Sequence, residues 1–377
     1  MSEIIKKNIV FVTGTRADYG KLKTVIKACN EEPSFNVTIF ATGMHMLSKY
    51  GETIEEIRKD FSDKVYPFIN QGVEEHMEIT LSNTINGLSR YLDEYKTDLV
   101  VVHGDRVEAL AGAIVGGIKN ILVAHLEGGE SSGTIDESIR HAVSKFSHLH
   151  FVSNEIALER IVRLGENPKN IHVIGSPNVD TIQNGSLPPI KLVKQHYELD
   201  YQEYAVLIYH PVTSETSDLR EKTEEVMQAC VNSGLNYIVI KPNNDFGSDT
   251  IVSVFKNYEM CDCFRFLPSM RFEAYLTALK HSLFIIGNSS SGIYDAPLFG
   301  VPTINIGSRQ NGRFTAESIV NIPDGYSNVL SAINIAKVKP RFDINEFYGS
   351  GNSSAQFLKV LKTKNIFRIS TQKAFFD

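Results

Sequence analysis

Residues 121–150 read ILVAHLEGGESSGTIDESIRHAVSKFSHLH, and this stretch decides the fold. Its apolar run at 121–129 predicts a β-strand, the polar stretch at 132–141 begins a helix, and the apolar run at 149–154 predicts a second strand. A strand, a helix and a further strand in this order form the unit from which parallel α/β sheets are built. The stretch also gathers proton-exchanging side chains around its glycine turn: Glu127, Glu130, Asp136, Glu137, His125, His141, His148 and His150.

The same alternation runs through the rest of the chain. Further strands are predicted at 9–14, 36–43, 63–69, 98–105 and 171–176, with helical patterns at 18–31, 44–60 and 75–96. A stretch rich in Gly, Pro, Asn and Ser at 175–190 then breaks the rhythm. A second set of strands follows at 204–211, 236–242, 264–269, 283–290 and 302–308.

We therefore predict an α/β protein with two Rossmann-like, doubly wound parallel-sheet domains that face a central cleft. The first domain is expected to span residues 1–177 and the second residues 178–353. A C-terminal helix at 354–377 is expected to pack back on the first domain.

The composition argues against several classes of protein. The 377 residues are 42% hydrophobic and 22% charged, and the net charge of −6 disfavours a nucleic-acid partner, which requires a basic patch. No apolar run reaches the about 18 residues of a membrane span, and no signal-peptide pattern opens the sequence, so we expect a cytoplasmic protein. Cys261 and Cys263 form a C-x-C pair, which we interpret as idle thiols rather than a metal site or disulfide.

Three acids follow neighbouring predicted strands. Asp105 and Glu127 come directly after strands, and Asp136 opens the next helix. The carboxyl ends of parallel strands meet at one edge of the sheet, so these side chains are expected to converge there. Like charges held close raise some carboxyl pKa values, which provides an acid and a base near neutral pH. Each acid taken alone could be a helix cap, and a metal site is the weaker functional alternative because no pair has ligand spacing.

Loops of the first half are suited to an anionic ligand. Gly14 permits a tight turn before a helix N-terminus, whose free N–H groups attract anions. Arg16 and Arg106 offer guanidinium groups that match a phosphate. The alternative is that both arginines are ordinary surface charges.

The second half contributes a stronger signal of the same kind. The sequence GNSSSGIYD at 287–295 follows an apolar strand and opens a helix with Ser289, Ser290, Ser291 and Gly292, which together can cradle a pyrophosphate. Asp295 lies further along that helix, where its carboxylate could bind ribose hydroxyls. His210 and Arg309 follow strands at the same edge, although His210 could instead be a buried structural histidine.

Together these loops resemble the hydrolysing UDP-N-acetylglucosamine 2-epimerases of sialic-acid and legionaminic-acid biosynthesis. The matching strings include TGTRADYGKL, ATGMHM, HGDR, HLEGGE, SSGTIDESIRH, IGSP, HPVT, PNND and GNSS, and the match runs in order from residue 13 to residue 313. The resemblance implies a two-domain architecture of the glycosyltransferase-B type that needs neither metal nor other cofactor. It also implies a homodimer or homotetramer, for which the helix at 75–96 is a candidate interface.

The resemblance further implies a reaction. UDP is eliminated from UDP-N-acetylglucosamine across C1–C2 of the sugar to give a glycal, and water then adds at C1 to release N-acetylmannosamine and UDP. Asp105, Glu127 and Asp136 match the catalytic acids, and His210 matches a histidine near the phosphates. Our hypothesis places Asp105 and Glu127 near the C2 proton and Asp136 near the sugar. The implied UDP contacts are Arg16, Arg106, His210, Asn243, Ser289, Ser290, Ser291, Gly292, Asp295 and Arg309.

Position 295 departs from the family pattern, which commonly has Glu there, so the shorter Asp295 needs a backbone shift or a water to reach the ribose. Three alternatives remain open at this point. The same motifs occur in enzymes that act on UDP-2,4-diacetamido-2,4,6-trideoxyglucose in the legionaminic-acid pathway. A glycosyltransferase of the same architecture would need an acceptor groove and one dominant base, and a non-catalytic nucleotide-sugar sensor would not need three acids.

Overall fold

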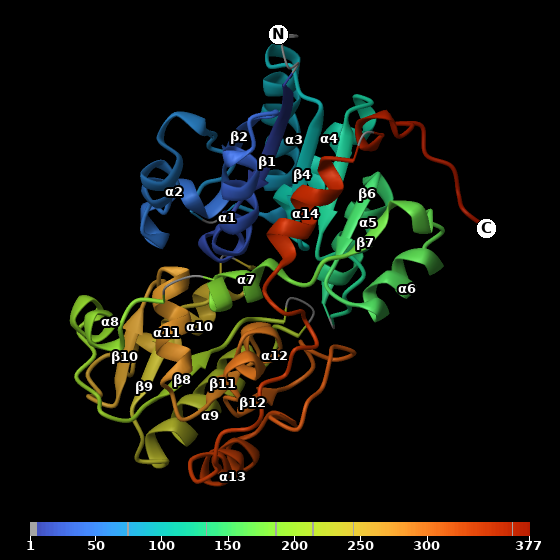
Figure 1. Ribbon diagram of the computed structural model, residues 1–377. Coiled ribbons are helices and arrows are strands. Elements are labelled where there is room, and N and C mark those ends of the chain that lie inside the picture. The colour runs from blue at the N-terminus through green and yellow to red at the C-terminus, as the bar shows by residue number, and fades with distance from the viewer. Residues whose placement is uncertain are drawn as a thin grey trace. The chain divides into compact units, whose positions relative to one another are not determined.

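A computed structural model describes residues 6–73, 75–132, 134–184, 187–212, 215–243, 245–363 and 365–377. Four residues of the loops singled out above, Gly133, Thr213, Ser214 and Asn244, lie outside the described residues. The chain divides into two compact units (Figure 1). The first unit comprises residues 1–130, 136–185 and 347–377, and the second comprises residues 131–135 and 186–346. In the described ranges no helix combines the length and the apolar character needed to cross a membrane.

The first unit is built on a seven-stranded sheet in the order β3-β2-β1-β4-β5-β6-β7, and every strand pair is parallel. β4 and β5 are buried along their whole length, as expected for a sheet covered on both faces. The predicted strands of this half are confirmed. They are β1 (Lys7–Thr13), β2 (Phe35–Ala41), β3 (Val65–Pro67), β4 (Leu99–His103), β5 (Leu122–Leu126), β6 (Leu149–Val152) and β7 (Ile171–Val173).

Helices connect these strands within the first unit. They are α1 (Arg16–Glu31), α2 (Ile54–Phe61), α3 (Met77–Glu94), α4 (Val107–Ile118), α5 (Ile135–Phe146), α6 (Glu155–Arg163), α7 (Pro177–Asn184) and α14 (Ser353–Leu361). The helical pattern predicted at 44–60 corresponds to two 3₁₀ turns (Gly43–Met46 and Ser48–Tyr50) followed by α2 rather than to one continuous helix. Gly51 ends the second turn with a φ of 88°, a left-handed conformation that glycine adopts at little cost.

The C-terminal segment corrects two expectations. α14 does belong to the first unit, where Phe357 and Leu361 join its hydrophobic core, but the predicted helix at 354–377 ends at Leu361. Beyond it the chain forms a 3₁₀ turn at Ile366–Arg368, and the Phe376 N–H donates to the Gly165 carbonyl of the same unit at 3.0 Å. α7 packs against α1 and α14, so the units change at residues 185 and 186 and again at 346 and 347, not at 177 and 353.

The second unit has a six-stranded parallel sheet in the order β10-β9-β8-β11-β12-β13. Five strands are as predicted: β8 (Ala205–Ile208), β9 (Tyr237–Ile240), β10 (Phe264–Leu267), β11 (Ile285–Gly287) and β12 (Thr303–Ile306). The edge strand β13 (Ile319–Ile322) was not predicted, because its two central residues are exposed and it forms no continuous apolar run. The helices are α8 (Ile190–Tyr197), α9 (Leu219–Asn232), α10 (Ser248–Lys256), α11 (Phe272–Lys280), α12 (Ser291–Tyr294) and α13 (Tyr326–Ala336).

Each sheet has one point at which the chain reverses its direction of travel. In the first sheet the chain moves from β1 outward to β2 and β3, and then returns to β4 on the other side of β1. In the second sheet the same reversal separates β8 from β11. Ligands of open parallel α/β sheets bind beyond the carboxyl ends of the strands at such switch points. The loops after β1, β4, β8 and β11 are therefore the places to look for a functional site.

Candidate active site

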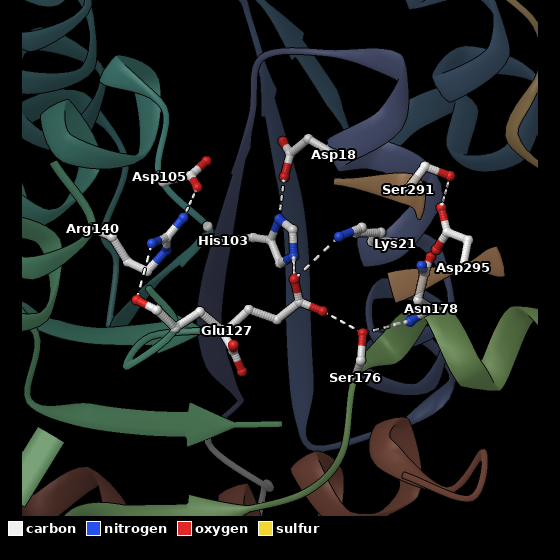
Figure 2. Close-up of polar contacts among 12 residues, drawn as sticks. Asp18, Lys21, His103, Asp105, Glu127, Arg140, Ser176, Asn178, Ser291 and Asp295 are labelled. Atoms are coloured by element: carbon white, nitrogen blue, oxygen red, sulfur yellow. Dashed lines mark hydrogen bonds and ion pairs between the residues drawn. The ribbon is translucent and has the colours of Figure 1, made fainter. Parts of the chain in front are cut away.

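Glu127 follows β5 directly, and its carboxylate is buried among three donors (Figure 2). Lys21 Nζ lies 3.2 Å and His103 Nε2 lies 3.0 Å from Glu127 Oε2, and the Ser176 hydroxyl donates to Oε1. Burial alone would raise the pKa of Glu127, but the two cations and the hydroxyl offset burial and hold the pKa well below its ordinary value. The carboxylate is therefore ionised and fixed in orientation.

The backbone at Glu127 is unusual as well. Its φ of 60° lies in the left-handed region, which residues other than glycine seldom adopt. Conformations of this kind persist only where the surroundings impose them, and they concentrate at functional sites. Here the Glu127 N–H donates to the Phe151 carbonyl of β6 at 2.9 Å, which fixes the turn against the sheet.

Asp105 follows β4, the strand that pairs with β5, so two of the three predicted acids stand at neighbouring strand ends. Its side chain is 28% exposed and forms an ion pair with Arg140 of α5 (Figure 2). Arg140 is buried and also donates to the Glu130 carbonyl at 3.0 Å. Asp136, partly buried, lies in the first turn of α5, one turn before Arg140. α5 thus carries the predicted acid Asp136 and also Arg140, the cation that pairs with the predicted acid Asp105.

The two arginines predicted to bind phosphate are both engaged with acids of the first unit. Arg16 lies 2.9 Å from Glu56 of α2, and Arg106 lies 3.3 Å from the buried Glu108 of α4. A ligand phosphate would have to share or displace these carboxylates. The role of both arginines as UDP contacts stays a prediction.

In the second unit, His210 and Asn288 join the two strands at the switch point. The Asn288 side-chain amide accepts from the His210 backbone N–H at 2.7 Å and donates to the His210 carbonyl at 2.8 Å. The Asn243 backbone N–H donates to His210 Nδ1 at 3.4 Å, which favours the neutral tautomer with its proton on Nε2. Arg309 and Gln310 both donate to the Asn288 carbonyl, at 3.3 and 2.7 Å. The predicted residues His210 and Arg309 thus both bond to Asn288. The third, Asn243, bonds to the His210 ring.

The serine-rich loop after β11 divides into an accessible part and a buried part. Ser289 and Ser290 are partly exposed, whereas Ser291, Gly292 and Asp295 are buried. Asp295 does not lie further along the helix as predicted, because α12 ends at Tyr294. The Ser291 hydroxyl donates to Asp295 Oδ2 at 2.5 Å, so one oxygen of the predicted ribose-binding carboxylate has a partner in α12. A Cβ at Gly292 would come within 2.6 Å of Thr303 Cγ2, so glycine is needed there for packing on β12. α12 has only four residues, so the helix dipole offered to a phosphate is short.

The sequence reasoning missed several residues of this arrangement: Asp18, Lys21, His103, Arg140, Ser176, Asn288 and Gln310. A signal existed for two of them. His103 opens the string HGDR at a strand end, and Lys21 lies one turn after Asp18 in TGTRADYGK. Within the described residues no group of three or more His, Cys, Asp or Glu side chains has a geometry that could hold a metal ion. Cys261 and Cys263 lie on the loop before β10, with their sulfurs 2.6 Å apart.

Comparison with solved structures defines the class of fold. UDP-GlcNAc 2-epimerase from Neisseria meningitidis bound to UDP-GlcNAc gives a TM-score of 0.77 at 16% identity over 94% of this chain and 99% of that chain. UDP-GlcNAc 2-epimerase from Methanocaldococcus jannaschii, in complex with UDP-GlcNAc and UDP, gives 0.79 at 21% identity over the same shares. At these identities the similarity concerns the fold. It confirms the predicted architecture of two doubly wound parallel-sheet units of the glycosyltransferase-B type.

Sequence comparison then defines the family. The family described as UDP-N-acetylglucosamine 2-epimerase matches residues 27–362. A UDP-N-acetylglucosamine 2-epimerase of Neisseria meningitidis is 42% identical over 98% of this chain and 99% of its own length. A UDP-N,N'-diacetylbacillosamine 2-epimerase (hydrolyzing) of Legionella pneumophila is 34% identical over 95% and 96%. The chain belongs to the UDP-N-acetylglucosamine 2-epimerase family, and the resemblance found in the loops is confirmed.

Proposed function

We propose that this protein is a hydrolysing UDP-N-acetylglucosamine 2-epimerase, which converts UDP-N-acetylglucosamine and water into N-acetylmannosamine and UDP. The Neisseria meningitidis relative, named UDP-N-acetylglucosamine 2-epimerase, is 42% identical over 98% of this chain. The Legionella relative, named for the diacetylated sugar, is 34% identical over 95%. The observation that carries the proposal is the pair of acids at neighbouring strand ends, Asp105 and Glu127, beside the switch point of the first sheet. Asp105 pairs with the buried Arg140, and Glu127 pairs with the partly buried Lys21.

The chemistry requires charges of both signs. Breaking the C1–O bond leaves positive charge on the sugar ring and negative charge on the departing diphosphate. Carboxylates stabilise the ring, whereas arginines and backbone N–H groups stabilise the diphosphate. In addition, one carboxylate takes the C2 proton in the first step, and one later activates water for addition at C1 while C2 regains a proton. A site with three acids meets these needs without an acceptor sugar.

The surroundings of the acids support a division of roles. Glu127 is bound by three donors and has a pKa held well below its ordinary value, so it is a weak proton acceptor. We assign it to stabilise the positive charge on the sugar. Asp105 is more exposed and pairs with Arg140, so we assign it to take the C2 proton. Asp136 is assigned to the water that attacks C1. This revises our hypothesis that Glu127 shares the C2 proton with Asp105.

The test is the product analysis in heavy-oxygen water. Purified protein is incubated with UDP-N-acetylglucosamine, and the released sugar is identified by mass spectrometry. We expect N-acetylmannosamine with the label on C1 and UDP without it. A labelled UDP would mean cleavage at phosphorus, and release of UDP only when an acceptor sugar is added would indicate a glycosyltransferase instead.

The roles of the acids are tested by exchange at C2 in deuterium oxide. The Asp105→Asn variant is expected to lose incorporation of deuterium at C2 of recovered substrate and of product. The Asp136→Asn variant is expected to retain incorporation while releasing glycal. Full exchange by Asp105→Asn would remove Asp105 from the role of base.

The diacetylated substrate is the second candidate, because the Legionella relative at 34% identity spans nearly the whole chain. Parallel assays with UDP-2,4-diacetamido-2,4,6-trideoxyglucose decide between the two sugars by kcat/KM. We also retain the expectations of a cytoplasmic homodimer or homotetramer, and of a cleft that closes on UDP. They stay predictions, which size-exclusion chromatography and scattering with and without UDP test.

A further inference from the structure

His103 lies between two carboxylates at the switch point of the first sheet (Figure 2). Its Nδ1 is 2.8 Å from Asp18 Oδ1, and its Nε2 is 3.0 Å from Glu127 Oε2. A neutral imidazole has only one N–H and can donate to only one of these carboxylates. The geometry is satisfied on both sides only when both nitrogens carry protons, so the ring is an imidazolium that bonds to both acids.

The charges around His103 are consistent with this protonation state. Asp18 and Lys21 face it from α1, and Glu127 and His125 face it from β5 and the turn that follows. His125 is neutral, because burial lowers its pKa to about 3. His103 and Lys21 both contact Glu127, and Asp18 contacts the other side of the His103 ring, so two carboxylates and two cations lie together with balancing formal charges. Burial alone would lower the pKa of His103, but Glu127 and Asp18 offset burial and raise it to about 9.

The elements that carry these residues are rigid. His103 is the last residue of β4, and Glu127 follows the neighbouring β5, whose Leu126 is in register with His103. Asp18 is in the first turn of α1, where its Oδ2 also accepts from the Gly14 N–H at 3.2 Å. The ring therefore links the glycine turn after β1 to the acid after β5. Both ring nitrogens of His103 thus face a carboxylate, Asp18 on one side and Glu127 on the other.

We propose that His103 is a positioning residue, which holds the Glu127 carboxylate in one orientation and keeps it ionised, and that Asp18 maintains the positive charge of His103. This inference rests on the proposed function, because it gives Glu127 a part in the reaction. Lys21 and Ser176 complete the support of the same carboxylate. His103 itself takes no proton from the substrate.

The test compares wild type with the Asp18→Asn and His103→Gln variants. The first readout is the pH dependence of kcat/KM for UDP-N-acetylglucosamine. We expect wild type to lose activity as pH rises through about 9, where His103 loses its second proton. Asp18→Asn removes one of the two opposite charges near the ring, so the alkaline limb should move to lower pH by about one unit or more. His103→Gln should lower kcat about 100-fold while KM changes less than about 3-fold.

The second readout is the ¹⁵N chemical shifts of His103 in histidine-labelled protein, which need no substrate. Both nitrogens should keep imidazolium shifts up to about pH 8 in wild type and lose them at lower pH in Asp18→Asn. The His150→Gln variant is the matched control, since it alters a buried His–Glu pair of the same unit, and it should leave the alkaline limb unchanged. A His103 ring that is neutral at pH 7, or an alkaline limb that Asp18→Asn does not move, overturns the inference. If the protein releases no UDP at all, the proposed function fails while the NMR result still decides the charge of His103.

Discussion

The first unit contains two buried pairs of the same composition that behave in opposite ways. In the switch-point cluster, His103 contacts Glu127, which also contacts Lys21. In the second cluster, which we call the tail cluster, His150 Nε2 lies 3.3 Å from Glu166 Oε2, and Lys145 and Lys373 lie 2.8 and 2.6 Å from the Glu166 carboxylate. Each cluster thus contains a histidine that contacts a glutamate, and at least one lysine on the same glutamate.

The two histidines nevertheless differ in charge. Burial lowers the pKa of His150, and Lys373 and His148 lower it further against the opposing effect of Glu166. Its Nδ1 has no hydrogen-bond partner among the described residues, whereas Nδ1 of His103 meets Asp18. The second carboxylate is the difference. His150 faces one carboxylate beside lysines, and its pKa is lowered. His103 faces two carboxylates, and its pKa is raised.

The positions of the clusters match this difference. The switch-point cluster stands where the first sheet reverses direction, and the tail cluster ties the C-terminal segment to α5. Lys373 donates to the carbonyls of Lys145 and Ser147 at the end of α5, where orphan carbonyls need donors. We therefore expect the first cluster to govern catalysis and the second to govern stability.

The largest effect should come from the same substitution made in each cluster. Glu127→Gln removes the carboxylate assigned to the sugar, so kcat should fall about 10³-fold. Glu166→Gln should leave kcat within about 2-fold at 20 °C, because the Glu166 carboxylate is bound by His150, Lys145 and Lys373 of the tail cluster. UDP release measures both. Equal losses in the two variants would erase the distinction between the clusters.

The Glu166→Gln variant, which should keep its activity, is expected to lose stability. The Glu166 side chain is 4% exposed and contacts three donors, so Glu166→Gln leaves Lys373, which is 23% exposed, and Lys145 without their counter-charge. We expect a loss of about 3 kcal/mol in the free energy of unfolding of the first unit, or about 6–12 °C in melting temperature. Calorimetry measures it, with Glu159→Gln at an exposed helix pair as the control that should change little. A Glu166→Gln variant as stable as wild type would mean that the tail is not held by these charges.

A smaller effect should appear in the pH dependence of stability. The pKa of His103 is raised in the folded state from 6.5 to about 9, so its stabilising contribution is complete below pH 6.5 and is lost as pH rises through about 9. The pKa of His150 is lowered from 6.5, so its neutral ring favours the folded state above pH 6.5 and this contribution is lost as pH falls. Urea unfolding of His103→Gln and His150→Gln at pH 5, 7 and 9.5 should therefore show opposite trends relative to wild type. Parallel trends would contradict the assigned charges.

The smallest effect should come from Lys145→Met. The Lys145 side chain is 44% exposed, and solvent screens its contact with Glu166. Lys373 remains on the same carboxylate, so the expected loss is at most about 1 kcal/mol in urea unfolding at pH 7. A loss as large as that of Glu166→Gln would mean that Lys145, not the tail lysine, supports the cluster.

The sequence predicted what depends on local pattern. The apolar runs identified twelve of the thirteen described strands, and the rule for parallel sheets brought Asp105 and Glu127 to neighbouring strand ends. The partners of these acids could not be read in the same way. Asp18 and His103 are 85 residues apart, and Glu127 and Ser176 are 49 apart, so only the folded chain brings them into contact. Likewise, the sequence pattern predicted that the Asp295 carboxylate binds ribose, but it did not indicate that the Ser291 hydroxyl bonds to that carboxylate.

The return of α14 to the first unit has a consequence for synthesis on the ribosome. Residues 186–346 of the second unit emerge while the first unit still lacks Phe357 and Leu361, which belong to its hydrophobic core. Domains usually mature from the N-terminus as the nascent chain lengthens. In this protein the order is reversed for the last step, because the core of the half that is made first is closed only when α14 (Ser353–Leu361) follows the second unit.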